Sequence, residues 1–165
     1  MGIAIFQSDE EIIQIIKCEK RILKKPSGPK PSNRETKQKF ELETVDGAAK
    51  FEVFFAQNSR LPRDFSLGLM VEKFMLIRYN GFHGTTRAGY HRFQHHENPH
   101  SHTLTVDDIL SSRESAPTKI DDMTGNYLDY EGAKLFFLRS CGIINYADYF
   151  DFSRYNQLTF DDLDL

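Results

Sequence analysis

The chain has 165 residues, the length of a single domain, and it can bury a hydrophobic core without disulfide bonds. Its 39% hydrophobic residues and fourteen phenylalanines exclude a disordered chain, and no apolar run is long enough to cross a bilayer. The net charge of −3 excludes a chain that is basic throughout. We therefore expect one domain over residues 1–165. The N-terminus becomes acidic at Asp9 without a basic leader, so we expect a cytoplasmic protein.

A capping box opens the first predicted element. Ser8 and Glu11 have the S-x-x-E spacing, in which each side chain satisfies a backbone amide at a helix start. Apolar residues then recur at helical spacing, and basic residues gather where the dipole at a helix end favours positive charge. The pattern predicts a helix over about residues 9–25, followed by a proline-rich connector. The apolar positions are Ile12, Ile15, Ile16, Ile22 and Leu23.

The hydrophobic period changes to two from residue 37, which is typical of half-buried strands. Asp46-Gly47 supplies a turn between the first two runs. The run over 73–79 is apolar on both faces, which favours a central place in a sheet. Residues 81–99 have no periodicity and predict a long loop. The predicted strands cover residues 37–44, 51–55, 65–71, 73–79 and 99–104.

The C-terminal part of the chain returns to helical spacing. Thr105 predicts the cap of a short helix, and a polar loop over 112–124 follows it. A longer helix is predicted over 127–141, with Gly142 as its C-terminal cap. These elements predict an α+β fold in which helices cover one face of an antiparallel sheet of about five strands. The helical parts are the N-terminal helix over 9–25 and the C-terminal part over 106–152, and the sheet lies within 37–104.

All six histidines lie within twenty consecutive residues. Histidines with unrelated structural roles would be scattered along the chain, so this clustering suggests a shared task. His100 and His102 form an H-x-H pair on a predicted strand, where residues two apart point to the same face. Both imidazoles are therefore expected to project next to each other. The histidines are His83, His91, His95, His96, His100 and His102.

The H-x-H pair suits two kinds of chemistry. Two neutral imidazoles can share a divalent metal such as zinc, with a third ligand from His83, His91, His95 or Glu97. Alternatively, one imidazole acts as base and the other as acid in phosphodiester cleavage, because histidine titrates near neutral pH. The structural alternative is that both imidazoles pack against sheet neighbours and bond to the backbone. The sequence leaves these three interpretations open.

Arg78 lies at the end of the strand predicted over 73–79. If this strand pairs with the strand over 99–104, the guanidinium comes close to His100 or His102. A guanidinium beside two imidazoles predicts a phosphate-binding site, since arginine can donate two parallel hydrogen bonds to phosphate oxygens. The alternative is an arginine at the edge of a sheet that pairs with a carboxylate.

Three short parts of the sequence carry a resemblance. They are Phe65-Ser66-Leu67, the stretch Leu76-Ile77-Arg78-Tyr79-Asn80-Gly81 with His83, and Pro99-His100-Ser101-His102. Over about residues 50–140 the chain resembles small uncharacterised bacterial proteins carried near prophages and mobile elements. More distantly it resembles TumE-type toxins of toxin–antitoxin pairs. The resemblance implies an antitoxin as partner and a site made of Arg78, His83, His100 and His102.

These patterns lead to two hypotheses about function. In the first, the protein is a ribonuclease-like toxin or defence component that acts on the phosphodiesters of RNA. Arg78 then holds phosphate, His100 and His102 exchange protons, and His83 assists. In the second, it is a non-catalytic domain whose loop over 81–99 binds a ligand, a divalent metal such as zinc, or a protein. The chain has no glycine-rich nucleotide loop and no H-E-x-x-H motif.

Overall fold

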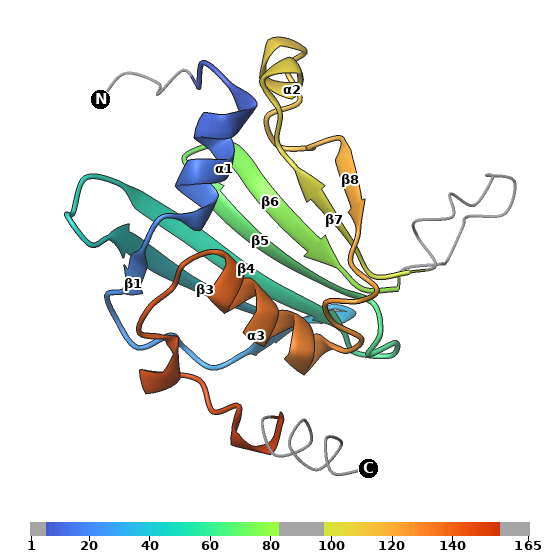
Figure 1. The fold of residues 1–165 in the computed structure, drawn as a ribbon. Helices are drawn as coiled ribbons and strands as arrows, with labels where there is room; N and C mark the ends of the chain where they lie inside the picture. Colours follow the sequence, from blue (N-terminus) through green and yellow to red (C-terminus); the bar gives the residue numbers. More distant parts are fainter. Residues whose placement is uncertain (1–5, 83–97, 156–165) are drawn as a thin grey trace, which may run out of the picture.

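An eight-stranded sheet with helices against one face forms from residues 6–82 and 98–155, the part of the chain that the computed structural model describes (Figure 1). None of the described helices is long and apolar enough to span a membrane. The helices are α1 (Asp9–Lys17), α2 (Val106–Leu110), α3 (Tyr130–Ser140) and the 3-10 helix η2 (Tyr146–Asp148). The strands are β1 (Lys20–Ile22), β2 (Lys30–Ser32), β3 (Glu35–Thr44), β4 (Lys50–Asn58), β5 (Phe65–Val71), β6 (Phe74–Asn80), β7 (His100–Thr103) and β8 (Lys119–Asp122).

Neighbouring strands of the sheet are antiparallel. Their order is β1-β3-β4-β5-β6-β7-β8, and β2 also pairs with β3. The α+β class and the antiparallel sheet are therefore confirmed, but the expected number of about five strands is wrong. The five predicted strands correspond to β3, β4, β5, β6 and β7. Three short strands extend the sheet beyond residues 37–104.

Helix α1 is shorter than the helix predicted over 9–25. Ser8 caps its N-terminus as expected, but the helix ends at Lys17. The following residues Lys20–Ile22 form β1, which pairs with β3 and buries its apolar side chain against the sheet. The apolar positions in this part of the chain fit both a helix and a strand. Pairing with β3 and hydrogen bonds to the segment after α3 decide between the two, because Lys20 donates its backbone amide to the Gly142 carbonyl oxygen and Ile22 donates its own to the Asn145 side chain.

The C-terminal part over 106–152 is not wholly helical. The predicted polar loop over 112–124 contains β8, whose four residues are all exposed. Periodicity cannot reveal such a strand, because no side chain in it is buried. Helix α3 covers the central part of the range predicted over 127–141. Gly142 follows it with a φ of 70°, as its predicted role as a cap requires.

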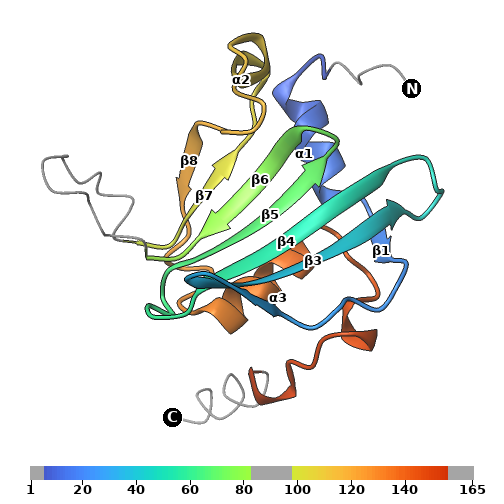
Figure 2. The ribbon, with the colours of Figure 1, turned by 180° about the vertical axis from the view of Figure 1, so that it is seen from behind.

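Helices α1 and α3 lie on the same face of the sheet (Figure 1), whereas α2 lies beyond the ends of β7 and β8 (Figure 2). The main core lies between this face and the two helices. Phe137 of α3 contacts Phe55 and Tyr79 of the sheet, each with its ring centroid 5.7 Å away. No helix in the described part of the chain covers the opposite face, which we call the open face (Figure 2). The predicted packing of helices on one face therefore holds for α1 and α3 but not for α2.

A β-bulge decides which side chains of β6 reach the open face. The register between β5 and β6 shifts at Leu69 and Met70, where β6 has one residue more than β5. Phe74, before the bulge, packs against Phe6 on the helix side. After the bulge, Tyr79 packs against α3, so its neighbour Arg78 points to the open face. Without the bulge, Phe74 and Arg78 would lie on the same face.

Candidate functional site

Two rows of side chains cross the open face over strands β5, β6 and β7. In the first row, Gly68 pairs with Arg78, and Arg78 pairs with His102. The second row, one pleat further along, contains Ser66, Asn80 and His100. Residues directly opposite each other in antiparallel strands have Cβ atoms about 4.5–5.5 Å apart. The register therefore brings one arginine and two histidines from distant parts of the sequence to one place.

The expected pairing of Arg78 with the H-x-H strand is confirmed by this register. Arg78 lies opposite His102, and His100 lies opposite Asn80. The two imidazoles also share a face, as the spacing predicts, with ring centroids 5.1 Å apart and ring planes at 70°. The remaining predicted site residue, His83, lies outside the described residues.

The Arg78 guanidinium is half-buried and its Nε is fully enclosed. Burial lowers the pKa of Arg78 from its ordinary value, although the group stays charged at neutral pH. Nε has no hydrogen-bond partner among the described residues, and no described carboxylate forms an ion pair with this side chain. The predicted alternative, an arginine paired with a carboxylate, therefore finds no support in the described part. A buried donor of this kind is costly unless a ligand or another group accepts its proton.

Gly68 lies next to Arg78 in the first row, and its lack of a side chain makes space there for the Phe54 ring. A Cβ at this position would collide with the Phe54 ring and would closely approach the Met75 sulfur. The absent side chain therefore leaves the space that the Phe54 ring occupies on the open face. One side of the arginine is thus bordered by apolar groups, which limits water and strengthens any charge interaction at the guanidinium.

His100 is held in one tautomer by its neighbours. Its Nδ1 lies 2.8 Å from the Asn98 carbonyl oxygen, which can only accept, so Nδ1 carries the proton in the neutral ring. Its Nε2 lies 3.4 Å from the Asn80 amide nitrogen, which donates. The Asn80 amide is oriented in turn by Ser66, whose hydroxyl donates to the amide oxygen at 2.6 Å. With His100 only 1% exposed, the Ser66–Asn80–His100 chain forms a fixed polar row.

His102 is less buried than His100 and is oriented in the same way. Its Nδ1 lies 3.1 Å from the Pro117 carbonyl oxygen and must donate to it. In the neutral ring the lone pair therefore sits on Nε2, the atom that would act as a base or bind a metal. Each imidazole thus has its Nδ1 bound to a backbone carbonyl, an arrangement that orients catalytic and metal-binding histidines alike.

A metal site is not completed by the described residues. No group of three His, Cys, Asp or Glu residues in residues 6–82 and 98–155 could hold a metal ion. His100 and His102 are two potential ligands, whereas a zinc site uses three or four protein ligands. The further ligands expected from His83, His91, His95 or Glu97 lie outside the described residues, so a zinc site stays a prediction.

Three residues that sequence reasoning missed support the site. Asn80 and Ser66 belong to the polar row, and Tyr127 donates hydrogen bonds to its backbone from the helix side of the sheet. The Tyr127 hydroxyl lies 2.9 Å from the Asn80 carbonyl oxygen and 3.1 Å from that of His100. Two-residue spacing from Arg78 could have placed Asn80 on the open face. Nothing in the sequence indicates that Tyr127, between β8 and α3, reaches these two carbonyl groups.

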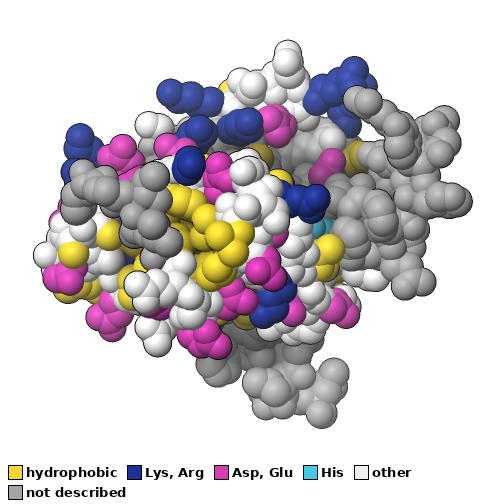
Figure 3. Space-filling model, turned by 90° about the horizontal axis from the view of Figure 1, so that it is seen from above, with side chains coloured by type: hydrophobic (Ala, Val, Ile, Leu, Met, Phe, Trp, Pro, Cys, Tyr) yellow, Lys and Arg dark blue, Asp and Glu magenta, His cyan; other side chains and the backbone are white. Residues whose placement is uncertain are grey.

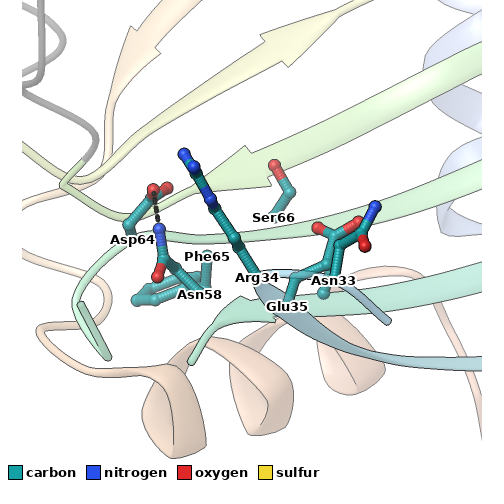
Figure 4. A pocket seen from close by; sticks show the side chains of 8 residues that line it. Asn33, Arg34, Glu35, Asn58, Asp64, Phe65 and Ser66 are labelled. Atoms are coloured by element: carbon teal, nitrogen blue, oxygen red, sulfur yellow. Dashed lines mark hydrogen bonds between the residues drawn. The ribbon is translucent and has the colours of Figure 1, made fainter. Parts of the chain in front are cut away.

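A pocket of about 670 Å³ adjoins the polar row. It lies where the β2–β3 hairpin meets the turn between β4 and β5, and Ser66 belongs to both pocket and row. Figure 4 shows the Arg34 side chain rising between Asp64 and Ser66. The described residues that line the pocket are mostly polar and carry both signs of charge. A volume in this range suits a small polar ligand.

The surface charge shows no single-sign field on the face seen in Figure 3. Basic and acidic side chains are interspersed there, and a histidine side chain is visible. This agrees with the net charge of −3. A nucleic-acid ligand would therefore depend on local contacts at Arg78 and Arg34 rather than on long-range attraction.

Comparisons of the chain with protein-family models, with curated proteins and with solved structures found no match. The resemblance to small prophage-associated proteins and to TumE-type toxins is therefore still a prediction. The function must be argued from the site itself.

Proposed function

We propose that the open face binds and cleaves a phosphodiester of RNA, as a ribonuclease-like toxin or defence component would. The observation that carries the proposal is the position of Arg78, directly opposite His102 with an enclosed Nε that has no partner among the described residues. A phosphate oxygen is an anionic acceptor for the charged guanidinium. In this proposal the substrate is RNA, the protein acts in the cytoplasm, and a protein of antitoxin type restrains it.

The proposed reaction needs His102 in its neutral form and His100 in its protonated form. His102 Nε2 takes the proton of the ribose 2′-hydroxyl, and the 2′-oxygen forms a bond to phosphorus. The bond from phosphorus to the 5′-oxygen breaks, and the leaving oxygen takes a proton from the His100 imidazolium. Arg78 stabilises the charge on the non-bridging oxygens during this exchange. The assisting role of His83 belongs to the same proposal and stays a prediction.

The reaction can be tested by controlled bacterial expression of the wild type and two variants. His102→Ala should reduce RNA cleavage by about 10²–10⁴-fold, because a proton-transfer group is lost. Arg78→Gln should reduce it by about 10²–10³-fold, because a charged donor at the phosphate is lost. Growth and the integrity of total RNA are the readouts, and purified protein with a labelled oligoribonucleotide gives the rates.

Arg60→Gln is the matched control, since Arg60 is an exposed arginine in the turn between β4 and β5. It should leave both readouts unchanged. Circular dichroism establishes that each variant folds. Intact RNA with wild-type protein, in cells and in the purified assay, would refute the enzymatic proposal. The non-catalytic binding domain would then become the better description.

A further inference from the structure

Two opposite charges line the pocket beside the polar row without pairing. Arg34 comes from the β2–β3 turn and Asp64 from the residue before β5, and both contribute to the same pocket (Figure 4). No oxygen of Asp64 lies within 4.0 Å of a nitrogen of Arg34, the limit for an ion pair. The Arg34 guanidinium has no side-chain partner in the described part of the chain. The pocket therefore presents a cation and an anion that are separated by more than a direct contact.

Asn58 and Glu35, two other polar residues of the pocket, are already engaged. Asn58 donates from its amide nitrogen to Asp64 at 3.1 Å, and its amide oxygen accepts from the backbone amides of Arg60 and Leu61 at 2.9 and 3.1 Å. Glu35 forms an ion pair with Lys37 at 3.0 Å. Asn58 thus holds the Asp64 carboxylate in place. A carboxylate has about four acceptor sites, so Asp64 keeps capacity for a ligand.

The pocket lies within reach of the proposed reaction site. Ser66 lines the pocket and pairs across the sheet with Asn80, two residues from Arg78. Asp64 lies two residues before Ser66, so with strands about 4.8 Å apart and about 3.4 Å per residue the Cα atoms of Asp64 and Arg78 are about 14 Å apart. The two side chains and one nucleotide between them can together span this distance. A ligand with its phosphate at Arg78 can therefore place its base in the pocket.

We infer that the pocket binds a guanine base, and this inference rests on the proposed function because it names the nucleotide that the site selects. Guanine presents N1–H and N2–H donors on one edge and the acceptors O6 and N7 on another. Asp64 accepts from the donor edge, and the Arg34 guanidinium donates to O6 and N7.

The same two side chains reject the other bases. Adenine places an acceptor, N1, where Asp64 needs a donor, and an amino group where Arg34 needs an acceptor. Uracil flanks its single N–H with two carbonyl oxygens, which the carboxylate repels. Cytosine offers Asp64 an amino group but places the acceptor N3 beside it. A site built from one donor and one acceptor group disfavours such ligands because a polar group is left unpaired.

The test uses the full chain and the four nucleosides, which carry no phosphate, with saturation-transfer NMR and titration of amide shifts. Guanosine should bind in preference to adenosine, cytidine and uridine. Asp64→Asn and Arg34→Gln should each weaken guanosine binding by about 5- to 100-fold, the range for loss of one good pairing to a base. Arg60→Gln is again the matched control and should bind like the wild type.

Failure of this inference can be told apart from failure of the proposed function. Inorganic phosphate tests the Arg78 site, and its binding should be weaker in Arg78→Gln than in Arg34→Gln, while Arg78→Gln keeps guanosine binding. No guanosine binding, equal binding of adenosine, or guanosine binding unaffected by both pocket variants would overturn the guanine pocket. Arg34 is an exposed turn residue, so Arg34→Gln keeps the test decisive if Asp64→Asn disturbs the turn between β4 and β5.

Discussion

Replacing Lys20 with methionine should remove the ammonium that joins the ends of α1 and α3. Lys20 is 0% exposed, and its Nζ donates to the carbonyl oxygens of Ile16 and Cys18 at 2.8 Å each and of Cys141 at 3.0 Å. It also lies 4.9 Å from the centre of the Phe51 ring. Burial lowers the pKa of Lys20 from its ordinary value, but the three carbonyl groups favour the charged form. They belong to helix ends, where carbonyl groups lack partners within the helix.

The expected loss of stability in Lys20→Met follows from the carbonyl groups that lose their hydrogen-bond donor. Each buried carbonyl left unsatisfied costs about 1–3 kcal/mol, so three of them set an upper range of about 3–9 kcal/mol. Methionine is uncharged, so the folded variant avoids the desolvation cost of a buried ammonium, which is several kcal/mol. It also keeps most of the volume of the lysine stem. We therefore expect Lys20→Met to lower the free energy of unfolding by about 3 kcal/mol, or the melting temperature by roughly 6–12 °C for a domain of this size.

Urea unfolding followed by circular dichroism measures this loss. Lys17→Met is the matched control, because Lys17 is exposed in the last turn of α1, and it should change stability by less than about 0.5 kcal/mol. A loss below about 1 kcal/mol for Lys20→Met, or a loss equal to that of the control, would refute the argument that the ammonium satisfies the two helix ends.

Two further stability predictions concern a helix cap and a glycine. Burial alone would raise the pKa of Asp108, but hydrogen bonds from Thr118 and Thr105 lower this pKa overall. Asp108→Asn should therefore lower the free energy of unfolding by about 1–2 kcal/mol at pH 7, measured by urea unfolding. The difference from the wild type should shrink as the pH falls from about 4 toward 2, because Asp108 is then protonated. An undiminished difference at pH 2 would contradict this. Gly142→Ala should lower thermal stability by at least about 2 kcal/mol, since φ is 70° and the Cβ would meet the Cys18 carbonyl oxygen. Gly125→Ala, with open space around it, is its control, and equal melting temperatures for the two would be inconsistent with the argument.

Local patterns in the sequence were sufficient to predict the elements around the site. Alternation of apolar residues predicts the strands that became β3, β4, β5 and β6, because each buries one face or both. The H-x-H spacing predicts two imidazoles on one face, and Arg78 at the end of a strand predicts its closeness to them. These predictions hold because they depend only on the two-residue repeat of a strand and on pairing across one loop.

The tertiary structure alone decided the remaining features. β2 and β8 are held by backbone hydrogen bonds to their neighbours, which do not depend on residue type, and their side chains are all exposed, so no pattern marks them. The apolar positions around β1 fit a helix as well, and its pairing with β3 decided between the two. The bulge at Leu69 and Met70 changes which side chains of β6 point to the open face, and no local pattern in the sequence predicts it. Lys20 reaches Cys141, and Asn80 and Tyr127 reach His100, across sequence separations that no local period encodes. The sequence by itself therefore determined which residues alternate along each strand, and the bulge and long-range pairing decided which of them meet on the open face.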